Sequence, residues 1–299
     1  MNKIHFMYVP MTGLGLYNGY RGDEWLTYRI NIFKNYVARA LLAQTKKEFI
    51  VWFSWRPEEK NNPIVKSLIR SLDGLQSMRF VHTFHGICFW DDKYEDSIAE
   101  ERLRSSLKGS LNDLTDYVPK DTDLVYMTIQ PSDDMYLPSA VETIQKITKK
   151  GAFGWKEGYL IDYHTKEISE YNPDTRPPFY TIVFDRSTFL DTEKHLKFTG
   201  PYKSHEFVPY YSDPLKERMF VVGTHGRNIS TVYNHPWKGR VLTQNEQDSI
   251  LIATNVYFSD PIPYKHSNYL FLRKLFNKIP FNNLLRDIYH KLPANLRKL

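Results

Sequence analysis

The feature that most constrains this chain is the order of apolar patterns over its first 150 residues. Four short apolar runs alternate with segments of helical spacing, and each run has the length of a buried strand. The runs are "KIHFMYV" (3–9), "EFIVWFSW" (48–55), "MRFVHTFHG" (78–86) and "LVYMTI" (124–129). A β-α-β-α-β-α-β order of this kind predicts a parallel sheet with helices on both faces.

The segments between the runs carry helix signals. Residues 23–44 have helical spacing, with Asp23 as the expected N-cap, and residues 62–74 read as a helix closed by Gly74. The third segment, Ser97 to Leu114, is a charged helix. The apolar positions of the first helix are Trp25, Ile30, Phe33, Val37 and Leu41.

After residue 150 the pattern changes to alternation of apolar and polar residues. Residues 152–172 predict an antiparallel hairpin around "DYHTKE", and "PFYTIVFDRSTF" (178–189) predicts another strand. "RMFVVGTHGRNIST" (218–231) reads as a strand that runs into a glycine-containing loop. We therefore expect one α/β domain with a mixed, mostly parallel sheet over residues 1–262, followed by a short helical tail at 263–299.

Composition narrows the function classes. With 41% hydrophobic residues over 299 positions, the chain can bury a core, which excludes wholesale disorder. A net charge of +6 favours an anionic partner. Cys88 is the single cysteine, which excludes an internal disulfide. No signal-peptide or membrane-span pattern occurs, and we expect a cytoplasmic protein.

Two adjacent acids, Asp133 and Asp134, follow the fourth apolar run. Ligands of open α/β sheets bind outside the carboxyl ends of the strands, and two neighbouring carboxylates repel each other unless a cation or donors compensate. Together with His225 of "VVGTHGRN", they could hold Mg²⁺ or Mn²⁺. The alternatives are a solvated turn for the acids and, for His225, a histidine bonded to its own loop. Arg227 adds a fixed charge for an anion.

Three stretches of the chain resemble a family. "EWLTYRINIFKNYVARALLAQTKKEFIVWF", "MTIQPSDDMYLPSAV" and "FVVGTHGRNIST" are similar to motifs of bacterial rhamnosyltransferases, and the order of strands and acids resembles the GT-A (Rossmann-like) glycosyltransferase fold. The resemblance spans roughly residues 20–232. It implies a nucleotide-sugar donor, a metal on its diphosphate, and transfer of rhamnose or another hexose to a glycan or lipid-linked glycan used in a surface polysaccharide.

The resemblance also implies site roles. Asp134 and His225 would hold Mn²⁺ or Mg²⁺, and the earlier acid, Asp133, would contact the donor. Glu206 would be the general base, with Asp213 in reserve. The family motif carries an arginine and a further acid where this chain has Ile129 and Pro131, so the donor nucleotide stays open.

A glycine-containing loop, "PMTGLGLYNGYRGD", follows the first run, where a nucleotide-binding loop would sit. Arg21 or Arg29 could reach a phosphate or base from there. The alternative for Arg29 is a helix-surface or buried, salt-bridging arginine. The loop does not match the dinucleotide fingerprint.

Three other functions compete with glycosyl transfer. A metal-dependent phosphohydrolase also needs clustered acids and histidine, although it usually needs more ligands. A nucleic-acid module would suit the charge, but no binding motif is visible, and we expect no nucleic-acid partner. The third is a GT-A-like domain that has lost its activity.

The tail holds two amphipathic patterns divided by Pro280, with a single acid, Asp287, among many basic residues. An apolar helix face flanked by basic residues suits peripheral binding to an anionic membrane, such as the inner face of the cell membrane. It equally suits docking on the catalytic domain. The basic residues are Arg273, Lys274, Lys278, Arg286, Lys291, Arg297 and Lys298.

Overall fold

A computed structural model describes residues 1–12, 22–73, 77–86, 96–174, 177–199, 215–228 and 231–256. Its first sheet has six strands in the order β3-β2-β1-β4-β9-β6, with β1 to β4 parallel and β9 antiparallel to both of its neighbours. The predicted parallel sheet is thereby confirmed. The strands are β1 (Lys3–Val9), β2 (Ile50–Ser54), β3 (Arg79–Thr83), β4 (Leu124–Ile129), β6 (Gly151–Gly154) and β9 (Tyr180–Asp185).

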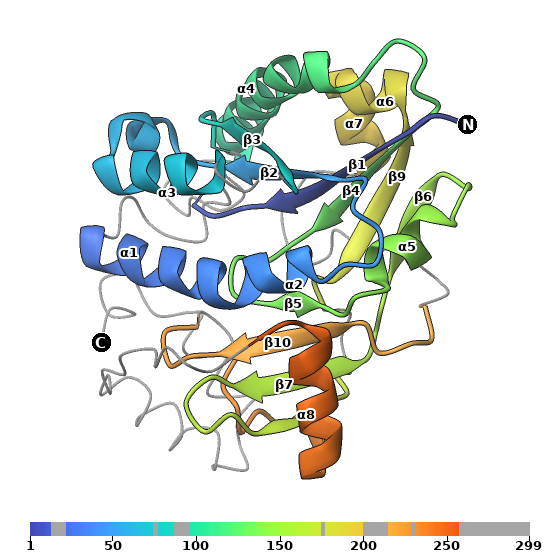
Figure 1. Ribbon diagram of the computed structural model, residues 1–299. Helices are drawn as coiled ribbons and strands as arrows, with labels where there is room; N and C mark the ends of the chain where they lie inside the picture. The colour runs from blue at the N-terminus through green and yellow to red at the C-terminus, as the bar shows by residue number, and fades with distance from the viewer. Residues whose placement is uncertain are drawn as a thin grey trace.

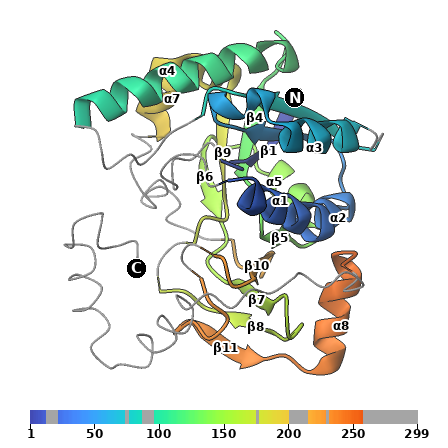
Figure 2. The same ribbon diagram turned by 90° about the vertical axis from the view of Figure 1, so that its left-hand side faces the viewer.

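Helices cover both faces of this sheet, as the alternating pattern predicted (Figures 1 and 2). One face packs on α1, α2, α3 and α5, and the other on α4, α6 and α7. The helices are α1 (Asp23–Ile32), α2 (Ala38–Leu42), α3 (Pro63–Asp73), α4 (Asp96–Leu114), α5 (Ala140–Gln145), α6 (Arg186–Leu190), α7 (Thr192–Thr199) and α8 (Gln244–Ala253). Short 3₁₀ helices span Pro57–Asn61 and Thr115–Tyr117.

Five further strands form a separate second sheet in the order β11-β8-β7-β10-β5. The predicted hairpin is present as the antiparallel pair β7 and β8. Of the described strands after residue 150, only β6 and β9 join the first sheet, which makes that sheet mixed, as predicted; the others belong to the second sheet. The second-sheet strands are β5 (Met135–Tyr136), β7 (Gly158–Asp162), β8 (Ile168–Tyr171), β10 (Phe220–Thr224) and β11 (Lys238–Val241).

The helix α1–α2 lies between the two sheets (Figure 1). Wider π-helical turns at Phe33–Val37 join its two halves. One side of it, including Leu26 and Phe33, packs on the first sheet, whereas Tyr28 and Tyr36 pack on the second. A helix that is covered on two sides explains why residues 23–42 are apolar around most of the circumference. It also carries side chains from both faces to the junction of the sheets.

One local prediction was wrong. Asp23 is the first residue of α1 and not its N-cap; Gly22 takes that position with φ 92°, a value that glycine tolerates, and no side chain caps the helix. Gly74, Cys88, most of the glycine-containing loop and the tail lie outside the described residues. Within the part of the chain that the structure describes, no helix has the length and apolarity to cross a membrane.

Candidate functional site

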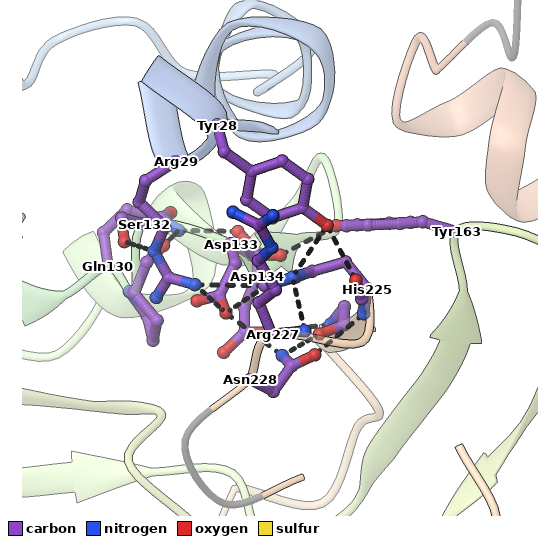
Figure 3. A network of polar contacts seen from close by, with 12 residues as sticks. Tyr28, Arg29, Gln130, Ser132, Asp133, Asp134, Tyr163, His225, Arg227 and Asn228 are labelled. Carbon is purple, nitrogen blue, oxygen red and sulfur yellow. Dashed lines mark hydrogen bonds and ion pairs between the residues drawn. The ribbon is translucent and has the colours of Figure 1, made fainter. Parts of the chain in front are cut away.

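Asp133 and Asp134 lie where the chain leaves one sheet and enters the other. The strand β4 ends at Ile129, and β5 begins at Met135, so the acids occupy the short link between the two sheets. The strand β5 pairs with β10, which places Met135 opposite Val221. The loop that follows β10 therefore faces the acids, and α1 faces them from the other side (Figure 3).

Asp133 is buried and accepts hydrogen bonds from two elements that are far apart in the sequence. Its Oδ2 lies 2.7 Å from the Arg29 guanidinium and 3.2 Å from Asn228 Nδ2. Arg29 also donates through Nε to Ser132 Oγ at 2.8 Å. Burial alone would raise the pKa of Asp133, but the Arg29 charge and the contacts with His225 and Arg29 hold that pKa below its usual value. Asp133 is therefore ionised and paired.

Asp134 has poorer compensation, although it is equally buried. Its Oδ1 accepts the backbone N–H of Gly223 at 2.8 Å. Burial, together with the charge of Asp133, raises the pKa of Asp134 well above its usual range. Arg29, Asp133 and Asp134 are the ionisable groups to compare at the junction. The positive charge of Arg29 and the negative charge of Asp133 balance each other. The carboxyl of Asp134 is left as the group that a cation would stabilise in its ionised form.

His225 is buried at the end of β10, and both of its ring nitrogens face protein groups. Nε2 lies 3.1 Å from Asp133 Oδ2 and 3.1 Å from Arg29, while Nδ1 lies 3.3 Å from Tyr28 Oη. Because Asp133 only accepts and Arg29 only donates, Nε2 bonds one of them and merely contacts the other. Burial lowers the pKa of His225. The imidazole is therefore neutral.

Close backbone packing fixes the loop after β10. A side chain at Gly223 would collide with the carbonyl of Asp133 and with the Tyr163 ring, so only glycine lets β10 approach the acids this closely. The Tyr163 hydroxyl donates to that same carbonyl at 2.7 Å. Gly226 has φ 80°, which turns the chain back toward the site. The glycine at position 223 thus serves the close approach of β10 to Asp133.

Arg227 lies at the edge of the site, half-exposed. Its guanidinium stacks 4.7 Å from the centroid of the Tyr28 ring and pairs with Glu24 at 2.9 Å. Glu24 is largely exposed, with 71% of its side chain accessible. An exposed ion pair of this kind is worth only about 0–1 kcal/mol. Arg227 can therefore exchange Glu24 for an anionic ligand at little cost.

The donor set at the junction fits a hard divalent cation in part. Within the described residues, no hydrogen bond reaches Asp133 Oδ1 or Asp134 Oδ2, and carboxylate oxygens are the ligands that Mg²⁺ and Mn²⁺ prefer. The nitrogens of His225, by contrast, are engaged. No group of three or more His, Cys, Asp or Glu side chains in the described ranges is arranged to hold a metal ion. That is compatible with Mg²⁺, which is usually bound by one or two carboxylates and completed by water and substrate phosphates.

The structure brings together Arg29, Asp133, Asp134, His225 and Arg227, five of the predicted site residues (Figure 3). Arg29 is the buried, salt-bridging arginine that was one of its two predicted alternatives. Arg21, Glu206 and Asp213 lie outside the described residues, so their roles stay predictions. Sequence reasoning missed four residues of the site: Tyr28, Ser132, Tyr163 and Asn228. Only Tyr28 carried a signal, as the neighbour of Arg29 in the helix.

Comparisons with known proteins identify no family for this chain. No family model and no curated protein sequence matches it. Among solved structures it is similar to 4-diphosphocytidyl-2C-methyl-D-erythritol synthase from Anaerococcus prevotii DSM 20548, at 13% identity and a TM-score of 0.33, over 85% of this chain and 97% of the other. It is also similar to a protein assigned as a nucleotide-diphospho-sugar transferase from Desulfovibrio desulfuricans G20, at 13% identity and a TM-score of 0.27, over 75% and 82%. The fold and site therefore rest on the strands and contacts described above.

Proposed function

We propose that this protein is a glycosyltransferase that binds the diphosphate of a nucleotide-sugar donor at the Asp133–Asp134 junction. One observation carries the proposal: a buried pair of acids, one of them without a counter-charge, ends a parallel strand at the edge where open α/β sheets bind ligands. The choice of a sugar transferase over other anion-binding enzymes comes from the sequence resemblance.

A divalent cation, Mn²⁺ or Mg²⁺, would be held by Asp134, whose carboxyl accepts a single backbone N–H. When bound, it would neutralise the negative charge that develops on the departing diphosphate. His225 supports the site through Asp133, because its own nitrogens face protein groups.

Arg227 supplies the second positive charge for the donor. The Tyr28 ring beneath it fixes the plane of its guanidinium, which suits bidentate contact with phosphate oxygens. Binding would replace the exposed Glu24 with a doubly charged ligand, so the exchange favours the donor.

A carboxylate must remove the proton from the acceptor hydroxyl. Glu206 is our first candidate and Asp213 the second, on the resemblance alone. The proposed sugar, rhamnose or another hexose, and the proposed acceptor, a glycan or a lipid-linked glycan, also rest on the sequence resemblance. Binding of the tail to the inner membrane surface is likewise a proposal, with salt-sensitive binding to anionic vesicles as its test.

A screen of nucleotide sugars tests the proposal. Donor at about 100 times its Kd would stabilise the protein by about 2.7 kcal/mol, so the right donor should raise the unfolding temperature when Mn²⁺ is present. That donor should then yield nucleoside diphosphate and a glycoside once a glycan acceptor is added. Asp134→Asn should lose both effects, whereas Asp116→Asn should keep them, because Asp116 is an exposed acid that precedes the start of β4 while the site follows its end.

Two results would contradict the proposal. If no nucleotide sugar shifts unfolding, the junction does not bind a donor. If inorganic phosphate appears without a glycoside, the site belongs to a phosphohydrolase.

A further inference from the structure

The two neighbouring acids have unequal surroundings, and this difference points to different roles. Three polar groups crowd around Asp133 Oδ2: Arg29 at 2.7 Å, His225 Nε2 at 3.1 Å and Asn228 Nδ2 at 3.2 Å. The carboxyl of Asp134 accepts one backbone N–H, from Gly223. The carboxylate of Asp133 has several partners, and the carboxyl of Asp134 has one (Figure 3).

The partners of Asp133 tie together three segments that the sequence keeps far apart. Arg29 comes from α1, Asp133 from the link between β4 and β5, and Asn228 from the loop after β10. Asn228 continues the tie inside its own loop, because its Nδ2 also donates to the Gly223 carbonyl at 2.6 Å and its Oδ1 accepts the His225 N–H at 2.8 Å. This set of contacts holds the loop that carries Arg227.

Arg29 cannot act as a ligand group for a donor while it holds this place. Its guanidinium is buried, with 9% of the side chain exposed, and it bonds Ser132 and Asp133 at once. Removing either member of a buried ion pair leaves an uncompensated charge, which is strongly unfavourable. Asp133 is bound to the protein in the same way through Oδ2, so Asp134, whose carboxyl has one backbone contact, is the acid with the greater capacity for a ligand.

We propose that Asp133 and Arg29 are positioning residues that lock α1, β4 and the 223–228 loop together, and that Asp134 alone of the two acids is indispensable for holding the cation. The cation-holding role of Asp134 rests on the proposed function, whereas the structural role of Asp133 and Arg29, which we call the lock, does not. The proposal assigns Asp133 to the architecture of the site and not to donor recognition, which the sequence resemblance had implied.

Matched isosteric substitutions test the lock without metal or nucleotide. Asp133→Asn removes the counter-charge of Arg29, and it should lower the unfolding temperature by roughly 5 °C or more. Asp134→Asn keeps the shape of a side chain whose carboxyl accepts only the Gly223 N–H and has no counter-charge, and it should leave the unfolding temperature unchanged or raise it. An Asp134→Asn variant destabilised as much as Asp133→Asn would overturn the proposal.

Mn²⁺ binding, followed by electron paramagnetic resonance, tests the division of roles. Asp134→Asn should lose binding, and Asp133→Asn should retain it with a Kd weakened by about 10- to 100-fold, as for a group that supports a ligand from outside. Equal loss in both variants would make Asp133 a ligand and refute the division. If the wild-type protein binds no Mn²⁺, the metal-binding part of the proposed function is wrong. The unfolding temperatures of Asp133→Asn and Asp134→Asn still test the lock in that case.

Asn228→Ala serves where Asp133→Asn does not fold, because it removes one donor and no charge. This variant should bind Mn²⁺ like the wild type and should bind nucleoside diphosphate about tenfold more weakly, since Arg227 is no longer held in place. An unchanged affinity for the diphosphate would show that the loop needs no lock. Arg240→Ala, at an exposed arginine paired with Glu246, is the control and should change neither affinity.

Discussion

Two buried polar networks use the same strand, β4, and differ in charge. The His5 network lies within the sheet: His5 Nε2 is 2.7 Å from Thr128 Oγ1, which is 2.5 Å from Thr181 Oγ1, and Gln145 Nε2 is 3.2 Å from His5 Nδ1. The Asp133 network, formed by Arg29, Asp133, His225 and Asn228, lies just beyond the end of that strand.

The His5 network contains only neutral groups. Gln145 Nε2 also donates to the Glu48 carbonyl at 2.9 Å, which identifies it as the amide nitrogen. Because this nitrogen only donates, His5 Nδ1 must be the acceptor. His5 Nε2 then donates to Thr128, which donates to Thr181. Each side chain in this hydrogen-bonded series has a partner, so the network does not need a ligand. Its place in the interior of the sheet makes it structural.

The Asp133 network differs because the acid beside it has no counter-charge. A satisfied neutral network stabilises one arrangement of the core, whereas a buried acid without a counter-charge ionises readily only when a cation from outside stabilises it. Burial alone therefore does not distinguish structure from function in this molecule. The balance of charge does, and substitutions in the two networks should behave differently.

The largest effect should come from Asp134. Asp134→Asn should reduce glycosyl transfer by at least about 10³-fold with the fold intact, because the cation that offsets charge on the departing diphosphate is lost. Rates measured with the donor found by screening, beside the Asp116→Asn control, give the answer. A variant with wild-type activity would place the active site elsewhere.

The next effect concerns the base. Glu206→Gln keeps the shape of the side chain and removes its basicity, so transfer should slow by roughly 10²-fold while donor affinity hardly changes. Asp213→Asn is the matched variant. If the loss falls on Asp213→Asn and spares Glu206→Gln, the two roles are exchanged.

Thr128→Val should affect stability and not activity. The valine removes the hydroxyl that bridges His5 and Thr181, and leaving buried partners unsatisfied should lower the free energy of unfolding by about 1–3 kcal/mol. Urea denaturation measures this loss, and a transfer assay should show an unchanged rate. A loss of transfer without a loss of stability would erase the distinction between the two networks.

Sequence reasoning predicted the elements that depend on local pattern. The four parallel strands, the helices between them and the hairpin follow from apolar runs and spacing, and the Asp133–Asp134 pair stood out because it ended a strand. The second sheet did not follow, because its strands pair across long separations, as β10 does with β5 and β7. The partnership of Arg29 with Asp133 spans 104 positions and has no signature in either segment.

The variant expected to change stability least at neutral pH is His5→Gln, whose effect lies in the acidic range. Burial lowers the pKa of His5 to about 3 from an ordinary value of 6.5. Below pH 6.5 the unfolded chain takes up a proton that the folded protein refuses, so His5 lowers stability as the pH falls from 6.5 toward 3. At pH 5.5 this cost is about 1 kcal/mol. His5→Gln should flatten the pH dependence of unfolding over this range, and an unchanged slope would contradict the neutral assignment of the network.

Calorimetric titration of a nucleoside diphosphate, with and without Mn²⁺, tests the central claim most directly. We expect Mn²⁺ to strengthen binding to the wild-type protein, Asp134→Asn to lose this increment, and Asp116→Asn to retain it. Equal affinity with and without Mn²⁺, or an Asp134→Asn variant that keeps the increment, would contradict a cation-assisted diphosphate site at the junction of the two sheets.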